Sequence, residues 1–114
     1  MNIESFRLYC LSKVAVEESL PFGPDTLVFK VMGKVFALTA LDKADFHVNL
    51  KCDPERSIEL RELYPEIIPG YHMNKKHWNT VDFEGSLTAS MLKELVDHSY
   101  ECVLKGFSKK QKDL

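Results

Sequence analysis

A chain of 114 residues, 45% hydrophobic and 28% charged, is long enough and apolar enough to fold around its own core. Its net charge of −2 argues against a strongly basic nucleic-acid binder, and no apolar run approaches the roughly 18 residues of a membrane-spanning helix. Glu4 and Arg7 interrupt the first ten residues, MNIESFRLYC, where a signal peptide would need an apolar core, so we expect one cytoplasmic domain over residues 1–114.

The N-terminal segment predicts a helix over residues 2–13, because Asn2 can cap it and apolar residues recur at helical spacing. The next stretch, VEESLPFGPD, ends in two prolines and a glycine, which predicts a loop or an edge segment rather than a central strand. The apolar positions of the helix are Ile3, Phe6 and Cys10.

Three strands are predicted over residues 26–52. The runs TLVFKVM and VFALTAL flank Gly33 and Lys34, and β-branched and aromatic residues on both sides of a glycine turn indicate a hairpin. The run FHVNLKC alternates strictly, which predicts a sheet with one buried face and one face in water. The residues expected to face inward are Phe46, Val48, Leu50 and Cys52, and those expected to face outward are His47, Asn49 and Lys51.

A second helix is predicted from Asp53-Pro54-Glu55, which combines a capping aspartate, a proline at the first helical position and an early acid. We expect it to turn Ile58 and Leu63 inward and to end at Tyr64, because Pro65 disfavours a helical residue before it.

Two further strands over 67–73 and 77–83, with a turn at 74–76, precede a long helix over about 88–106. The apolar stripe predicted for that helix consists of Leu92, Leu95, Val96, Ser99 and Val103. The order α-β-β-β-α-β-β-α predicts a two-layer α+β fold, with one antiparallel five-stranded sheet and three helices on one of its faces.

Three cysteines cannot all pair within one chain, and none has the CxxC spacing of a redox or zinc motif. We expect Cys10 and Cys102 to be free and buried among apolar neighbours, where thiols are inert. Cys52 lies beside Lys51, but we interpret it as structural too.

The segment GYHMNKKHWNTV contains the two histidines closest to a site-like pattern, His72 and His77. Their odd spacing would point them to opposite faces of a strand, and no cysteine or carboxylate lies in the segment, so we expect no metal. Acid–base catalysis would need an orienting carboxylate, and the nearest in sequence is Asp82. Hydrolase and nucleotide signatures are absent, so we assign no catalytic residue and expect no cofactor.

The lysines at the predicted hairpin tips offer a different chemistry. Lys34 belongs to the first tip, and Lys75 and Lys76 to the last, where flexible point charges suit non-specific contacts with phosphates. Trp78 could stack on a base, although tryptophan more often anchors a core. The last ten residues, KGFSKKQKDL, form a basic segment that we expect to be frayed and that could add phosphate contacts.

Four runs, LPFGPDTLVFKVMGKVFAL, VNLKCDPE, YPEIIPGYHMNKKHWNTV and DHSYECVLKGFSKK, resemble the MmcQ/YjbR family of small bacterial proteins. The resemblance spans about residues 11–110. It implies a secretion-chaperone-like fold, with the five strands in the spatial order 1-2-5-4-3, and DNA binding through a double-wing motif. We place the wings at Met32–Lys34 and Asn74–His77.

Three functions therefore stay open: weak, non-specific DNA binding, a protein-interaction module, and a small-ligand or enzyme site around His72 and His77. A flat basic strip would favour DNA, an exposed apolar patch a protein partner, and a pocket holding both imidazoles beside an acid an enzyme. The residues expected to bind nucleic acid are Lys34, Lys51, Asn74, Lys75, Lys76, His77 and Trp78, and those of the possible ligand site are Asn49 and His72.

Overall fold

The computed structural model describes residues 1–107 and contains three helices and six strands. In chain order they are α1 (Ile3–Leu11), β1 (Val16–Ser19), β2 (Thr26–Val31), β3 (Lys34–Ala40), β4 (His47–Lys51), α2 (Pro54–Leu63), β5 (Ile67–Pro69), β6 (Trp78–Asp82) and α3 (Ala89–Lys105).

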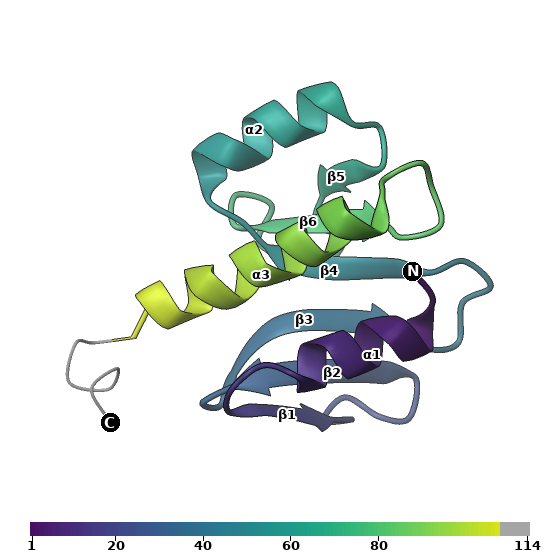
Figure 1. Ribbon diagram of the computed structural model, residues 1–114, viewed down its shortest axis with the longest axis vertical. Coiled ribbons are helices and arrows are strands. Elements are labelled where there is room, and N and C mark those ends of the chain that lie inside the picture. The colour runs from purple at the N-terminus through teal and green to yellow at the C-terminus, as the bar shows by residue number, and fades with distance from the viewer. Residues whose placement is uncertain (108–114) are drawn as a thin grey trace.

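The strands form one antiparallel sheet in the order β1-β2-β3-β4-β6-β5 (Figure 1). The α+β class is confirmed, but the expected count of five strands is wrong. The additional strand is β1, which lies in the segment that was expected to be a loop or an edge segment. It pairs with β2 at the edge of the sheet, and the two prolines and the glycine of the segment follow after the strand has ended.

The strand order implied by the family resemblance is also wrong. It would have placed β6 beside β3 and left β4 at an edge, whereas β4 lies between β3 and β6. The short connection over residues 41–46 explains the difference, because strands joined by a short loop usually pair with each other.

Local sequence signals account for most element boundaries. Met32 and Gly33 both have positive φ, at 51° and 82°, as a two-residue hairpin turn between β2 and β3 requires. The turn thus begins one residue before Gly33, and Lys34 already belongs to β3. The side chain of Asp53 accepts the Arg56 N–H at the start of α2, and that of Thr88 accepts a backbone N–H at the start of α3.

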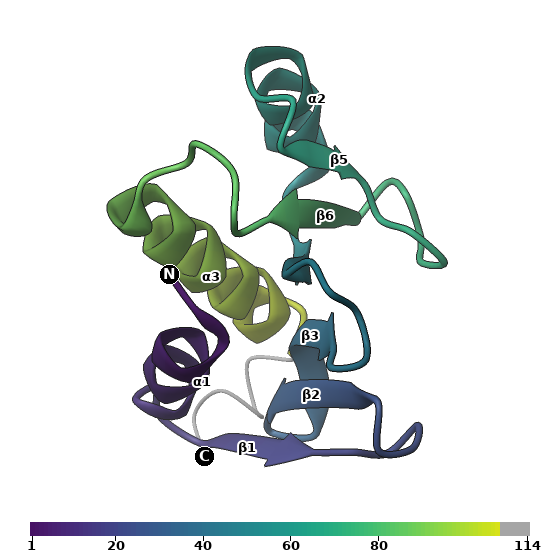
Figure 2. The same cartoon turned by 90° about the vertical axis from the view of Figure 1, so that its right-hand side faces the viewer.

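Helices α1 and α3 lie on the same face of the sheet, and no helix covers the opposite face within residues 1–107 (Figure 2). The predicted alternation of β4 is confirmed: Val48, Leu50 and Cys52 are buried, while His47 is exposed.

An edge-to-face cluster of phenylalanines from α1, β2 and the ends of β4 and β6 fills the core, and the predicted apolar stripe of α3 is buried. The phenylalanines are Phe6, Phe29, Phe46 and Phe83, and the stripe is Leu92, Leu95, Val96, Ser99 and Val103.

Ser99 connects α3 to the sheet at an irregular point. Strand β3 has a bulge at which Phe36 and Ala37 are both buried, and Phe36 leaves the pairing register with β2. The Ser99 hydroxyl donates to the Phe36 carbonyl at 2.5 Å and accepts the Lys51 N–H at 2.8 Å. One serine thus provides hydrogen-bond partners for two backbone groups, a carbonyl of β3 and an N–H of β4.

The prediction for α2 is wrong. Ile58 is 58% exposed and Leu63 is 69% exposed, whereas Ser57 and Leu60 are buried. The helix packs mainly against the edge strand β5 and reaches β6 through the hydrogen bonds of Ser57 and Arg61 to Asn79, so a single narrow stripe of the helix is covered.

Strand β5 is shorter than predicted: it ends at Pro69, whereas the expected strand continued to residue 73. Proline cannot donate to a ladder, and the last pairing interaction is the hydrogen bond from the Gly70 N–H to the Trp78 carbonyl at 2.8 Å.

All three cysteines are free, as predicted for Cys10 and Cys102. Cys10 and Cys52 are buried, but Cys102 is only half-buried, because its side of α3 turns toward the start of α2 and not into the core. No helix within residues 1–107 is long and apolar enough to cross a membrane. The basic segment expected to be frayed lies outside the described residues from position 108 onward.

Candidate functional site

The uncovered face of the sheet presents side chains from alternate positions of β4 and β6. Register pairs three residues of β4 with three of β6 across this face. From one strand end to the other, the pairs are Lys51 with Trp78, Asn49 with Thr80, and His47 with Asp82. One surface therefore carries Asn49 of the expected ligand site together with Lys51 and Trp78 of the expected nucleic-acid site.

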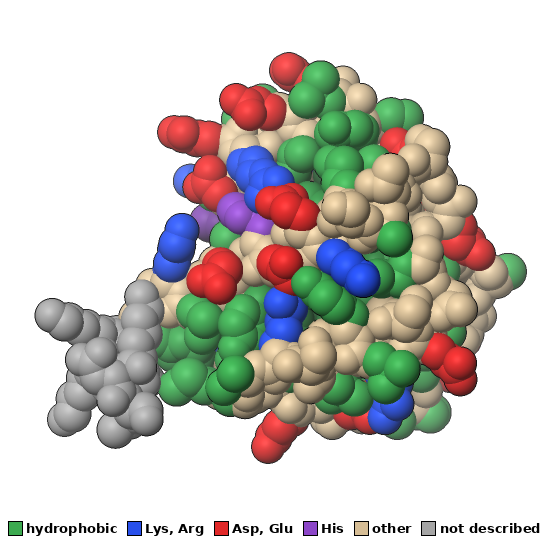
Figure 3. Space-filling model, in the orientation of Figure 1, with side chains coloured by type: hydrophobic (Ala, Val, Ile, Leu, Met, Phe, Trp, Pro, Cys, Tyr) green, Lys and Arg blue, Asp and Glu red, His purple; other side chains and the backbone are tan. Residues whose placement is uncertain are grey.

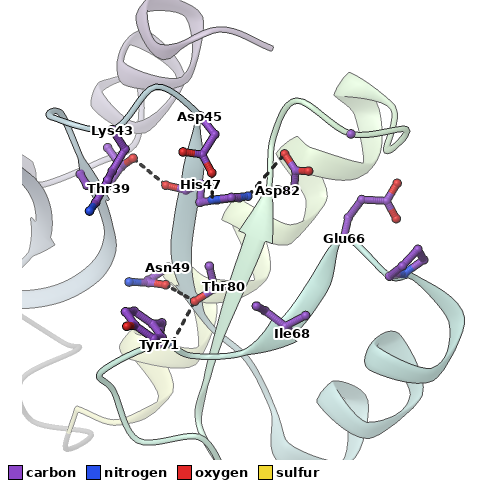
Figure 4. Close-up of a pocket in the computed structure, with 13 residues that line it drawn as sticks. Thr39, Lys43, Asp45, His47, Asn49, Glu66, Ile68, Tyr71, Thr80 and Asp82 are labelled. Atoms are coloured by element: carbon purple, nitrogen blue, oxygen red, sulfur yellow. Dashed lines mark hydrogen bonds and ion pairs between the residues drawn. The ribbon is translucent and has the colours of Figure 1, made fainter.

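A cavity of about 740 Å³ opens over the half of this face that carries His47 and Asp82. Its apolar wall consists of Ile68, which is 50% exposed, and Tyr71, which is 68% exposed. Polar side chains from β4, β6 and the loop between β3 and β4 make up much of the remaining lining (Figure 4). The volume lies within the range of small-molecule sites in proteins, which is about 300–1,000 Å³.

His47 lies between two carboxylates in this cavity, as Figure 4 shows. Its Nδ1 is 3.0 Å from Asp45 Oδ2, and its Nε2 is 3.8 Å from Asp82 Oδ1. Each ring nitrogen of His47 therefore faces one carboxylate, Asp45 from the β3–β4 loop and Asp82 from β6. The backbone is held as well, since the Thr39 hydroxyl donates to the His47 carbonyl at 2.7 Å.

The middle of the face is tied together by Thr80. Its hydroxyl donates to Asn49 Oδ1 at 2.5 Å and accepts the Tyr71 N–H at 3.0 Å. These bonds hold the start of the loop between β5 and β6 against the sheet, so the Tyr71 ring stays at the cavity.

Charges in the cavity are mostly negative. Asp45, Glu66 and Asp82 contribute carboxylates, and Lys43 contributes the single ammonium of the lining. Hydrogen bonds from the Ser86 hydroxyl and N–H lower the pKa of Glu66, which keeps this carboxylate ionised.

The opposite ends of the same strands are basic. Lys34 begins β3, Lys51 ends β4, and Lys75 and Lys76 lie just before β6, so antiparallel pairing brings these lysines to one end of the sheet. The nearest acid along the chain there is Asp53. On the helix-covered face, by contrast, acidic and basic side chains are interspersed over α3 (Figure 3).

Several basic side chains at this end of the sheet already have partners within the protein. The Lys34 ammonium lies 5.6 Å from the centre of the Phe107 ring, and Lys75 Nζ is 3.4 Å from the Gly70 carbonyl. Arg61 bonds internally, to the Lys75 carbonyl at 2.6 Å and to Asn79 Oδ1 at 2.8 Å.

The two histidines singled out by their sequence context lie outside the cavity lining. His72 is exposed at φ 59°, with its ring 4.0 Å from that of Tyr71, and the carbonyl of half-buried His77 accepts the Cys52 N–H. Asp82, the acid nearest to them in sequence, faces His47 instead. The sequence did place His47 on the outward face of its strand, together with Asn49. It gave no sign of the partner Asp82, because that residue comes from a strand distant in sequence.

A second polar cluster joins α3 to the start of α2. His98 Nε2 accepts the Asp53 N–H at 3.1 Å and lies 3.4 Å from Cys102 Sγ. Burial lowers the pKa of His98 and raises the pKa of Cys102, so neither a charged imidazole nor a thiolate is favoured. Within residues 1–107, no three His, Cys, Asp or Glu side chains are grouped to hold a metal ion.

Comparison with known proteins agrees with this architecture. A family model described as YjbR matches residues 11–102. The chain belongs to the YjbR family. The family resemblance seen in the sequence is thus confirmed.

Relatives of known sequence support the assignment. The chain is 38% identical to "Uncharacterized protein YbdF" of Escherichia coli O157:H7 over 107 residues, which cover 94% of this chain and 88% of that protein. It is 35% identical to "Uncharacterized protein YjbR" of Escherichia coli K12 over 101 residues, covering 89% and 86%.

Solved structures agree with it too. The crystal structure of protein DR2400 from Deinococcus radiodurans matches with a TM-score of 0.91 and 42% identity, covering 98% of this chain and 86% of that one. A crystal structure from Pseudomonas syringae matches with a TM-score of 0.78 and 33% identity, covering 90% and 98%. The YjbR-type fold is therefore established for this chain.

Proposed function

We propose that this YjbR-family protein binds DNA weakly and without sequence preference, through the basic end of its sheet. The observation that carries the proposal is the gathering of Lys34, Lys51, Lys75 and Lys76, from three separate segments, at one end of three adjacent strands. Ammonium groups on flexible stems suit contacts with a phosphate backbone rather than with base edges.

Charge separation along the strands answers the objection raised by the net charge of −2. The three acids that line the cavity, Asp45, Glu66 and Asp82, lie at the far strand ends, so a duplex at the lysine end meets them only across the length of the sheet. At physiological salt, the Debye length of about 8 Å screens charges at that separation.

Trp78 supports single-strand binding in particular. It is half-buried beside Lys51 on the uncovered face, where one side of the indole could stack on a base. Asn74 and His77 add polar groups in the same loop, and the wings in this proposal are Met32–Lys34 and Asn74–His77.

The test is a fluorescence anisotropy titration with duplex and single-stranded DNA at low and at physiological salt. We expect dissociation constants on the order of 10⁻⁴ to 10⁻⁶ M at physiological salt and much tighter binding at low salt. Replacing Lys75 and Lys76 together by alanine should weaken binding equally for all sequences, and it should reduce the salt slope by about one for each phosphate that the variant no longer neutralises.

The matched control replaces Lys43 and Lys93 by alanine, which removes the same charge from other surfaces. Equal weakening by both double variants, or no binding by the wild type at low salt, would refute the proposal. A protein-interaction role would then be the better account of this chain.

A further inference from the structure

The cavity at the acidic end of the sheet takes no part in the DNA proposal. We propose that it binds a small amine, a molecule with one ammonium group held by the carboxylates of Asp45 and Asp82 beside His47, and with an apolar body against Ile68 and Tyr71. The proposal is independent of DNA binding, because the two sites lie at opposite strand ends.

The first argument is a pair of carboxylates that flank His47. Asp45 Oδ2 lies 3.0 Å from one ring nitrogen and Asp82 Oδ1 lies 3.8 Å from the other, so both acids meet in one part of the cavity. An ammonium group has three donors and a positive charge, so it suits these two acceptors better than a hydroxyl does.

The second argument is charge. Three carboxylates and one lysine line the cavity, and a cation entering it is attracted while an anion is repelled. Asp45 and Asp82 use one oxygen each in the hydrogen bonds and ion pairs found among residues 1–107, which leaves Asp45 Oδ1 and Asp82 Oδ2 open to further donors.

The third argument is the apolar wall. Ile68 and Tyr71 leave half or more of their surface in water although they stand beside a cavity of about 740 Å³. A hydrocarbon or aromatic body would cover both side chains, and the Tyr71 ring can also face a cation. The bonds of Thr80 to Asn49 and Tyr71 hold this wall in place, so the site is preformed.

The experiment uses three probes with one body and different charge: tyramine, its uncharged analogue 4-ethylphenol, and its anionic analogue 3-(4-hydroxyphenyl)propionate. A fourth probe, isopentylamine, keeps the ammonium group on an aliphatic body. Each is titrated into isotopically labelled full-length protein and followed by two-dimensional amide NMR.

We expect tyramine to shift amides of residues 45–49, 66–71 and 80–82 in a saturable way at millimolar concentration. The uncharged analogue should bind more weakly, and the anion should not saturate.

Asp82→Asn tests the site with almost no change in shape, and we expect it to weaken tyramine binding about tenfold, as for the loss of a hydrogen bond to a charged group. The matched control is Asp42→Asn, which removes an acid from the same β3–β4 connection but outside the lining and should change binding by less than about twofold. The Lys75 and Lys76 double variant should bind tyramine like the wild type, which separates this site from the DNA surface.

Three results would overturn the proposal. They are no saturable shift with either tyramine or isopentylamine, equal binding of the anionic analogue, or equal weakening by Asp82→Asn and Asp42→Asn. Amide spectra of the free variants report whether each remains folded, so a loss of binding cannot be mistaken for a loss of structure.

Discussion

Ser99→Ala should destabilise the protein far more than the loss of one hydroxyl on a helix would ordinarily do. Ser99 is fully buried, and its hydroxyl bridges the Phe36 carbonyl at the β3 bulge and the Lys51 N–H at the end of β4. Alanine fits the same space but can neither donate nor accept. The substitution therefore leaves a buried carbonyl and a part-buried N–H without a partner.

The size of the effect follows from those two groups. A buried donor or acceptor left unsatisfied costs about 1–3 kcal/mol, so two cost about 2–6 kcal/mol. The better helix propensity of alanine returns about 0.5 kcal/mol. We expect the free energy of unfolding to fall by about 3 kcal/mol, a large share of the roughly 5–15 kcal/mol typical of a folded protein.

Urea denaturation followed by circular dichroism measures this loss. With an m-value of about 1.5 kcal/mol/M, the midpoint should move down by about 2 M while the slope stays unchanged. Ser90→Ala, on an exposed position of the same helix, is the control and should change stability by less than about 0.5 kcal/mol. A loss below about 1 kcal/mol for Ser99→Ala would refute the bridging role.

Three further predictions concern pH, packing and thiol chemistry. Burial holds the pKa of His98 below its ordinary value in the folded state, so stability present near neutral pH is lost on acidification, and His98→Gln should lose less between about pH 7 and about pH 5 in urea denaturation. Gly70→Ala would place a Cβ 2.9 Å from the Cβ of Trp78, and it should cost about 1–3 kcal/mol as β5 parts from β6. Burial raises the pKa of Cys10 to about 12, so a thiol reagent should label half-buried Cys102 first and Cys10 only on unfolding.

Each of these has a result that contradicts it. Identical acid sensitivity of the wild type and His98→Gln would show that His98 does not govern stability in that pH range. The control for glycine is Gly106→Ala, where the nearest atom to a new Cβ is 3.3 Å away, and equal losses would remove the packing argument. Labelling of Cys10 as fast as Cys102 in the native state would show that the α1 side of the core opens readily.

Predictions from sequence succeeded where a pattern reports directly on burial. The strict alternation of residues 46–52 predicted both faces of β4, and the stripe of α3 was predicted together with its one polar member, Ser99. They failed for α2, where Ile58 and Leu63 were expected inside. That helix has no broad apolar face, and its burial depends on how much of the sheet edge it reaches.

The candidate sites were predicted unevenly for the same reason. Lysines at hairpin tips are visible in sequence, because turns are local and their side chains point into water. The cavity was not predicted, since His47 and Asp82 meet only through strand pairing, and the loop carrying Tyr71 reaches them through Thr80. The histidines that attracted attention, His72 and His77, lie elsewhere.

The sequence by itself determined the α+β class, the family, the hairpin turn at Gly33, the starts of α2 and α3, and the two faces of β4. These depend on interactions between residues a few positions apart, which a single chain displays in order. Only the tertiary structure decided that β1 joins the sheet, that β4 lies between β3 and β6, and that the acids of the cavity lie at the strand ends opposite to Lys34, Lys51, Lys75 and Lys76. Those features follow from contacts between distant segments, whose free energy depends on the whole set of competing pairings rather than on any one stretch of residues.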